Sequence, residues 1–135
     1  MVESTTIIEV TTSIREELVD ITADVAEIVR GMGDGICIVS SMHSTGCIFV
    51  NENEKGLRRD VLQMLNSVVT AEGWAHDRID NNARAHLKSI IVGHSVTVPV
   101  QDGELLLGTW QQVFFAEFDG PRGRRVAVTF VGEKI

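Results

Sequence analysis

Residues 112–131, which read QVFFAEFDGPRGRRVAVTFV, are the stretch that decides the fold class of this chain. Residues 112–118 and 125–131 alternate with the period of two that is typical of β-strands. Between them, residues 119–123 carry the aspartate, glycines and proline that favour a turn. The stretch therefore predicts two strands joined by a short connection.

Strand-like runs continue on the N-terminal side of this stretch. Further strands are predicted over residues 5–12, 17–21, 36–41, 46–52, 96–100 and 105–107. The runs 36–41 and 46–52 read as a hairpin with His43 at its turn. Helices are predicted from residue 22 to the glycines at 31 and 33, over 57–69, and over 85–92. About seven strands with two or three helices predict an α+β fold, in which an antiparallel or mixed sheet is covered on one face.

Length and composition indicate one domain spanning residues 1–135, because 44% of the residues are hydrophobic and can form a single core. The net charge of −7 argues against a nucleic-acid partner. We find no apolar run of membrane-spanning length and no signal-peptide pattern, so we expect no membrane partner and a cytoplasmic location. Cys37 and Cys47 lie in apolar runs and are expected in the core, with a zinc–thiolate site or a disulfide as the alternative.

Three histidines in polar, loop-like settings are the candidate metal ligands. His43 lies at the predicted turn, His76 in a polar loop, and His86 just after that loop. Imidazole is the commonest transition-metal ligand, and three of them leave a position open for water or substrate. The spacing is not that of a local motif such as HExxH, and single histidines are often surface or packed residues. The metal would be zinc or magnesium. His94 has no acidic or amide neighbour, and we assign it no role.

Acidic residues near these histidines are candidates for proton transfer. Glu52 ends the strand that follows His43, and Asn51 or Asn53 could orient it. A polar strand end rich in turn-forming amides is the alternative. Asp80 could fix the tautomer of a ligand histidine. Asn82 is explained as well by helix capping.

The candidate substrate-binding residues are Asn53, Lys88, Ser89, Trp110 and Gln111. Lys88 and Ser89, near the start of a helix, could hold a phosphate, or could be solvated helix residues. Gly108 interrupts its run where another group can approach closely. Trp110 could then stack on a ligand ring, or serve as a core or interface aromatic.

Three stretches resemble the signature of the YjbQ family, also called the secondary thiamine-phosphate synthase family. They are SVTVPVQDGELLLGTWQ at 95–111, DNNARAHLKS at 80–89, and His43 followed by Asn51-Glu52-Asn53. The match runs in order over nearly the whole chain. Two departures stand out. Gly46 follows the His43-Ser44-Thr45 run where the family usually has alanine, and Trp74 stands where a tyrosine is common.

The resemblance implies an antiparallel sheet curved into a half-barrel, and a homotrimer. It implies that His43, His76 and His86 are the recurring histidines of the family, with a divalent metal plausible there. Its other recurring positions are Glu52, Asp80, Lys88, Ser89, Trp110 and Gln111. For activity it implies a thiamine-phosphate synthase, in which a thiazole phosphate displaces pyrophosphate from a pyrimidine diphosphate. Glu52, Asp80 and His86 would then be catalytic.

Three functional hypotheses stay open at this point. The first is an enzyme in which the three-histidine metal holds a small phosphorylated substrate or activates water. The second is a non-catalytic homo-oligomer that binds a metal or a small ligand in the same pocket. The third is an interaction or stability module with structural histidines. Whether the protein is an enzyme is not decided by the sequence.

Overall fold

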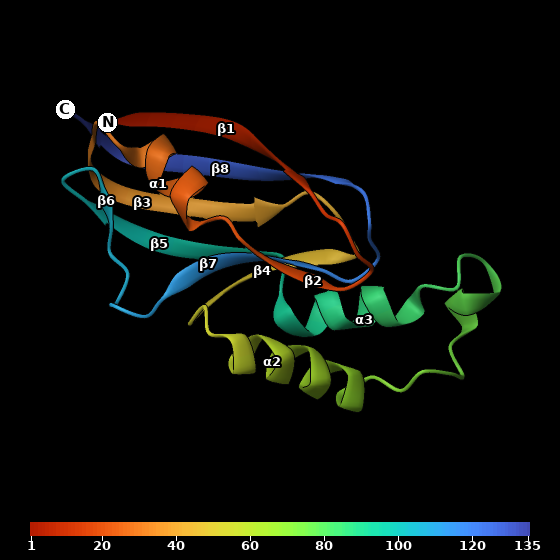
Figure 1. Cartoon of the computed structure of the whole chain (residues 1–135). Helices are drawn as coiled ribbons and strands as arrows, with labels where there is room; N and C mark the ends of the chain where they lie inside the picture. Colours follow the sequence, from red (N-terminus) through yellow and green to blue (C-terminus); the bar gives the residue numbers. More distant parts are fainter.

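The structure is a computed structural model that describes residues 1–135. Its elements in chain order are β1 (Val2–Thr11), β2 (Glu17–Asp20), α1 (Thr22–Val29), β3 (Met32–Ser41), β4 (Gly46–Asn51), α2 (Lys55–Val68), the short 3-10 helix η1 (Ala75–Arg78), α3 (Ala83–Val92), β5 (Ser95–Gln101), β6 (Glu104–Leu105), β7 (Gln112–Glu117) and β8 (Gly123–Lys134). Figure 1 shows strands above and the helices α2 and α3 below them.

Two antiparallel sheets make up the β part of the molecule. The large sheet has five strands in the order β1-β8-β3-β5-β6, and the small sheet has three in the order β2-β7-β4. The large sheet is curled into a half-barrel, which confirms the predicted α+β class and the curved sheet. Strand β8 lies between β1 and β3. Its burial alternates residue by residue because one face turns to the core and the other to solvent.

Strand β7 is buried on both of its faces. Val113 and Phe115 belong to the core between the two sheets, whereas Phe114 and Ala116 belong to a second core between the small sheet and the helices α2 and α3. Alternate side chains of a strand point to opposite faces, so a strand covered on both sides needs a continuous apolar run. This requirement explains the apolar run VFFA at residues 113–116.

The helices cover two different regions. Helix α1 contributes Val25 and Val29 to the core between the sheets. Helix α2 begins after Glu54, whose carboxylate accepts hydrogen bonds from the N–H groups of Gly56 and Leu57. Helix α3 begins two residues earlier than the predicted residue 85, directly after Asn82. None of the helices combines the length and the apolar character that a membrane span requires.

Two pairs of strands that follow one another in sequence do not pair in space. The predicted hairpin of β3 and β4 does not form, because β3 pairs with β5 and β8 on its two edges while β4 pairs with β7. Strands β7 and β8 likewise belong to different sheets. A strand has only two edges, so a neighbour in sequence must join the other sheet when both are occupied. The connections after β3 and β7 are therefore crossings between sheets, not turns.

Candidate functional site

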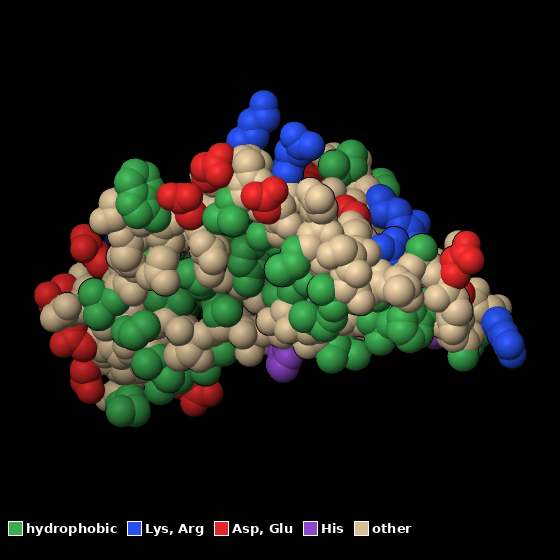
Figure 2. All heavy atoms as spheres, turned by 90° about the horizontal axis from the view of Figure 1, so that it is seen from below, with side chains coloured by type: hydrophobic (Ala, Val, Ile, Leu, Met, Phe, Trp, Pro, Cys, Tyr) green, Lys and Arg blue, Asp and Glu red, His purple; other side chains and the backbone are tan.

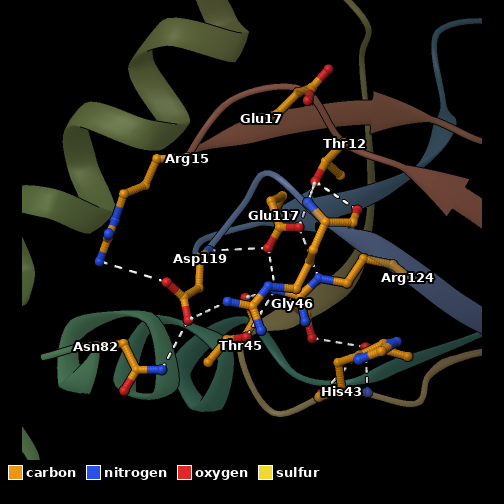
Figure 3. A network of polar contacts seen from close by, with 12 residues as sticks. Thr12, Arg15, Glu17, His43, Thr45, Gly46, Asn82, Glu117, Asp119 and Arg124 are labelled. Carbon is orange, nitrogen blue, oxygen red and sulfur yellow. Dashed lines mark hydrogen bonds and ion pairs between the residues drawn. The ribbon is translucent and has the colours of Figure 1, made fainter. Parts of the chain in front are cut away.

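Three connections cross between the two sheets at one end of the molecule. They are residues 12–16, 42–45 and 118–122. Backbone hydrogen bonds join them in pairs: Thr12 N–H donates to Arg122 O at 3.1 Å, and Phe118 N–H donates to Thr45 O at 3.1 Å. The fold thus gathers side chains from distant parts of the sequence, and Figure 3 shows the polar contacts among them.

A buried ion pair lies at the centre of these polar side chains. Glu117 is 0% exposed and Arg124 is 2% exposed. Arg124 Nε donates to Glu117 Oε1 at 2.8 Å, and its Nη2 donates to Oε2 of the same carboxylate. The hydroxyl of Thr12 donates to Glu117 at 2.8 Å, and Arg124 Nη2 donates to Thr45 Oγ1 at 2.9 Å. One ion pair therefore ties together all three connections.

The ionisation of Glu117 is set by these bonds. Burial raises the pKa of Glu117, but hydrogen bonds from Arg124, from the Asp119 N–H and from the Thr12 hydroxyl outweigh burial and bring the pKa below its ordinary value. The group is therefore a fully paired carboxylate at neutral pH.

His43 lies at the outer side of this ion pair, on the 42–45 connection. Its Nε2 accepts a hydrogen bond from the backbone N–H of Arg125 at 2.8 Å. In the neutral ring the proton is therefore assigned to Nδ1. Burial lowers the pKa of His43 from 6.5, nearby Arg124 lowers it further, and Glu117 opposes this in part. His43 is consequently a neutral imidazole near pH 7.

A hollow of about 350 Å³ opens beside His43. We call it the histidine hollow, and it is lined by His43, Ser44, Gly46, His86, Ser89, Ile90, Gly93 and His94. No carboxylate is part of this lining. The hydroxyl of Ser89 is buried and has no hydrogen-bond partner. The hollow therefore offers several imidazoles and one unused hydroxyl. It also includes His94, to which the sequence assigned no role.

His76 lies next to His86 but outside the lining of the histidine hollow. The two rings meet edge to face, with centroids 4.7 Å apart. Nε2 of His76 is buried without a hydrogen-bond partner, and Oδ2 of Asp80 is 3.9 Å from it. The fold thus brings together three of the sequence candidates here, His76, His86 and Asp80, with His43 across the hollow.

The predicted metal site is contradicted. No group of three or more His, Cys, Asp or Glu side chains is placed to hold a metal ion, so His43, His76 and His86 do not form the expected ligand set. Two local reasons account for this. Nε2 of His43 is already engaged by the N–H of Arg125, and the positive charge of Arg124 next to His43 disfavours a cation.

Lys88 and Ser89 lie on different sides of α3. Lys88 Nζ pairs with the carboxylate of Glu16 and donates to Asn66 Oδ1 at 2.8 Å. Its ammonium group also lies 5.2 Å from the centre of the Phe118 ring. Consecutive helical residues point about 100° apart, which places the Lys88 ammonium away from Ser89. A substrate-binding role for Lys88 stays a prediction.

Four other sequence candidates lie at the opposite end of the β4–β7 pair from the histidine hollow: Glu52, Asn53, Trp110 and Gln111. In this pair Gly46 faces Glu117 at one end, and Asn51 faces Gln112 at the other. Five residue steps along a strand span about 17 Å. Trp110 is 70% exposed. Within a single chain these four residues and His43 cannot contact the same small ligand.

The buried ion pair was missed by sequence reasoning, which took residues 119–123 only as a turn. A signal for Glu117 was present, because it is the one charged residue in the otherwise apolar run VFFAEF. A buried charge must have a partner. The identity of that partner, Arg124 on the other sheet, and its link to Thr12 follow only from the crossings between sheets.

Comparison with known proteins gives a consistent family. The family model described as UPF0047 protein YjbQ-like matches residues 6–133. A UPF0047 protein of Archaeoglobus fulgidus is 48% identical over 118 residues, which cover 87% of this chain and 93% of that protein. The UPF0047 protein YugU of Bacillus subtilis is 35% identical over 128 residues, covering 93% and 97%.

Solved structures agree with this family. A YbjQ-like protein of unknown function from Sulfolobus solfataricus superposes with a TM-score of 0.94 and 41% identity, covering 97% of this chain and 98% of that one. A hypothetical protein of Aeropyrum pernix gives a TM-score of 0.92 with 38% identity, covering 96% and 99%.

These relatives also correct the expected activity. The Sulfolobus protein is described as one of unknown function, and the matching family and relatives carry no thiamine-phosphate synthase activity in their names. The three-histidine metal that this activity was expected to use is not formed either. The prediction of a thiamine-phosphate synthase is therefore contradicted.

Proposed function

This chain belongs to the family of YjbQ-like UPF0047 proteins, and from the geometry of its histidine hollow we propose that it binds a small phosphorylated molecule there. The observation that carries the proposal is the hydroxyl of Ser89, which is buried at the hollow without a hydrogen-bond partner. Buried donors are normally satisfied, and a phosphate oxygen is a strong acceptor. A phosphate in the hollow would give Ser89 the partner that the protein does not supply.

The electrostatics of the histidine hollow support an anionic ligand. Its lining contains no carboxylate, so nothing there repels a phosphate. After burial, Arg124 lowers the pKa of His43, Glu117 raises it in part, and Arg122 and Arg125 lower it further, so most of the charges acting on this ring are positive. A volume of about 350 Å³ lies at the lower end of the range of about 300–1,000 Å³ that is typical of small-ligand sites.

The assigned tautomer of His43 suits the same role. Because Nε2 accepts from the backbone, Nδ1 holds a proton that it can donate. Near pH 7 the neutral ring can donate this N–H in a hydrogen bond to a phosphate oxygen while keeping the proton. His86, which also lines the hollow, can offer a second imidazole to the same ligand.

A homotrimer is the second part of the proposal, and the cytoplasm is its expected location. Hydrophobic side chains gather across the middle of the face that Figure 2 shows, with acidic side chains at one end. Exposed apolar residues on α2 and α3 include Val68 at 61%, Ile90 at 76% and Ile91 at 53% exposure. Such a surface is typical of a contact between subunits. Both cysteines are free thiols, which suits a reducing compartment.

A trimer would also explain how the four sequence candidates far from His43 could contribute to a binding site. Glu52, Asn53, Trp110 and Gln111 of one copy could complete the histidine hollow of another, although they cannot do so within one chain. Light scattering of the eluting protein tests this part, with three times the chain mass of 14.8 kDa expected. A monomer at micromolar concentration would rule the trimer out.

Ligand binding is tested with inorganic phosphate, followed by calorimetry and by the imidazole signals of His43 and His86 in NMR spectra at pH 7. Removing the donor with Ser89→Ala should weaken binding about tenfold, as expected for a lost hydrogen bond to a charged group. The control is Ser67→Ala on α2, whose hydroxyl bonds only to Met64 O at 2.7 Å on an exposed helix face. Binding that is equally strong in both variants would refute the site.

A further inference from the structure

A second hollow, of about 530 Å³, lies on the other side of α3 from Ser89. It is enclosed by the β1–β2 connection, α2, the segment before α3, and α3 itself. We call it the amide hollow, and the lining residues that matter here are Arg15, Asn66, Asp77, Asn82, Arg84 and Lys88. It shares no lining residue with the histidine hollow.

Asn82 presents an unused acceptor at this hollow. Its Nδ2 donates to Asp119 Oδ2 at 2.9 Å. A carboxylate only accepts, so the amide nitrogen must face Asp119 and the amide oxygen must face away, as Figure 3 shows. That oxygen is buried and has no hydrogen-bond partner. No group of the protein donates to it, so its donor is left to a water or a ligand in the hollow.

Asp77 adds a negative charge near the Asn82 oxygen, because it shortly precedes Asn82 in the chain and lines the same hollow. One of its oxygens accepts from the Ala83 N–H at 2.9 Å, which leaves the other oxygen free. Together, Asn82 and Asp77 form an acceptor pair at the start of α3. An ammonium group, with three donors and a positive charge, matches such a pair.

Cationic groups lie in the same lining. Arg84 donates to the backbone oxygens of Val69 at 3.1 Å and Asn66 at 2.9 Å, so carbonyls rather than a carboxylate hold it in place and its charge is not neutralised. Nη2 of Arg15 lies 3.6 Å from Oδ1 of Asp119, and the Arg15 side chain is 62% exposed. This ion pair is weak, so the guanidinium can turn towards a ligand. Either guanidinium can bind a carboxylate.

From these features we propose that the amide hollow binds a polar α-amino acid. Its ammonium group would bind Asn82 Oδ1 and Asp77, and its carboxylate would bind Arg84 and Arg15. The amide of Asn66 would face the ligand side chain. A phosphate dianion is a poorer match, because Glu16 and Asp77 place two carboxylates in the lining. This inference is independent of the phosphate site.

The first test titrates the protein with each of the twenty common L-amino acids, one at a time, at pH 7 by calorimetry. For the tightest binder, two analogues are then compared: the same molecule without its ammonium group, and the same molecule without its carboxylate. Each should bind at least tenfold more weakly. The inference is overturned if no amino acid binds saturably, or if either analogue binds as tightly as the parent.

The second test uses Asp77→Asn, which keeps the oxygen that caps Ala83 and removes the charge. Affinity for the amino acid should fall at least tenfold, while the weak binding of the analogue without ammonium should stay the same. A loss shared equally by both ligands would show a merely structural role and overturn the assignment. Asp80→Asn, outside the hollow, is the matched control. Phosphate affinity should not change in Asp77→Asn, so failure here is distinguishable from failure of the phosphate site.

Discussion

The substitution Glu117→Gln tests whether the buried ion pair fixes the end of the molecule that carries the histidine hollow. Glutamine has nearly the same shape as glutamate and can still accept from the Thr12 hydroxyl, now 2.8 Å from Glu117. It lacks the charge that balances Arg124, which is 2% exposed and cannot reach water. Its amide NH2 also takes the place of Oε2, which accepts from the Asp119 N–H and from Arg124 Nη2, so donors then face donors. The change therefore leaves an arginine buried without a counter-ion.

The expected cost follows from the loss of this carboxylate. Removing one partner of a buried ion pair costs about 3–5 kcal/mol, because the remaining charge is uncompensated. Domains of this size have stabilities of about 5–15 kcal/mol, so the variant should fold but be markedly less stable. The double variant Glu117→Gln with Arg124→Met removes both charges. It should recover most of the loss, since replacing a whole buried pair by uncharged groups is often close to neutral.

Denaturation in urea, followed by circular dichroism, measures these free energies of unfolding. Glu27→Gln is the matched control, because it removes a carboxylate from an ion pair at 2.8 Å with Arg30 whose side chains are 66% and 75% exposed. That change should cost less than about 1 kcal/mol. If Glu117→Gln costs no more than Glu27→Gln, or if the double variant is as unstable as the single one, the reasoning about the ion pair is wrong.

Three further predictions concern the same framework. The pKa of Glu117 is lowered from 4.5 in the folded protein, so its contribution to stability is present above that pH and is lost as the pH falls through the folded pKa. Glu117→Gln should therefore flatten the dependence of stability on pH below about pH 4.5. Urea unfolding at each pH measures this. Burial raises the pKa of Cys37 to about 11 and that of Cys47 to about 12. Neither thiol should therefore react with a disulfide reagent at about pH 8 until urea unfolds the protein. Reaction of either thiol in the folded protein would contradict their burial. Gly46→Ala places a Cβ 2.4 Å from Cζ of the buried Phe115 ring and should cost about 1–3 kcal/mol by thermal unfolding, whereas the open Gly123→Ala should cost far less.

Local pattern predicted the elements well where one periodicity held over the whole element. Helix α2 was expected to within two residues of its bounds, and the alternating part of β8 was expected over residues 125–131, although the strand runs from Gly123 to Lys134. Each has one apolar face and one solvent face. The predicted β3–β4 hairpin failed because sequence proximity does not say which sheet a strand joins. That depends on whether both edges of β3 are occupied, which is decided by β5 and β8, far along the chain.

In the candidate site, too, the residue types could be read from the sequence but their contacts could not. The sequence analysis named histidines and a serine as candidates, and the fold places His43, His86 and Ser89 around one hollow. Their chemistry was not predicted correctly, because a metal site depends on which nitrogen is free and on nearby charge. The N–H of Arg125 occupies Nε2 of His43, and Arg124 supplies the charge.

By itself, the sequence determined the α+β class and most of the strands and helices, because these depend on side-chain type and short-range periodicity. Only the tertiary structure decided that the chain crosses three times between two sheets at one end, that Glu117 and Arg124 meet there, and that α3 separates Lys88 from Ser89. Those outcomes depend on contacts between residues far apart in the chain, and such contacts leave no periodic trace in the sequence.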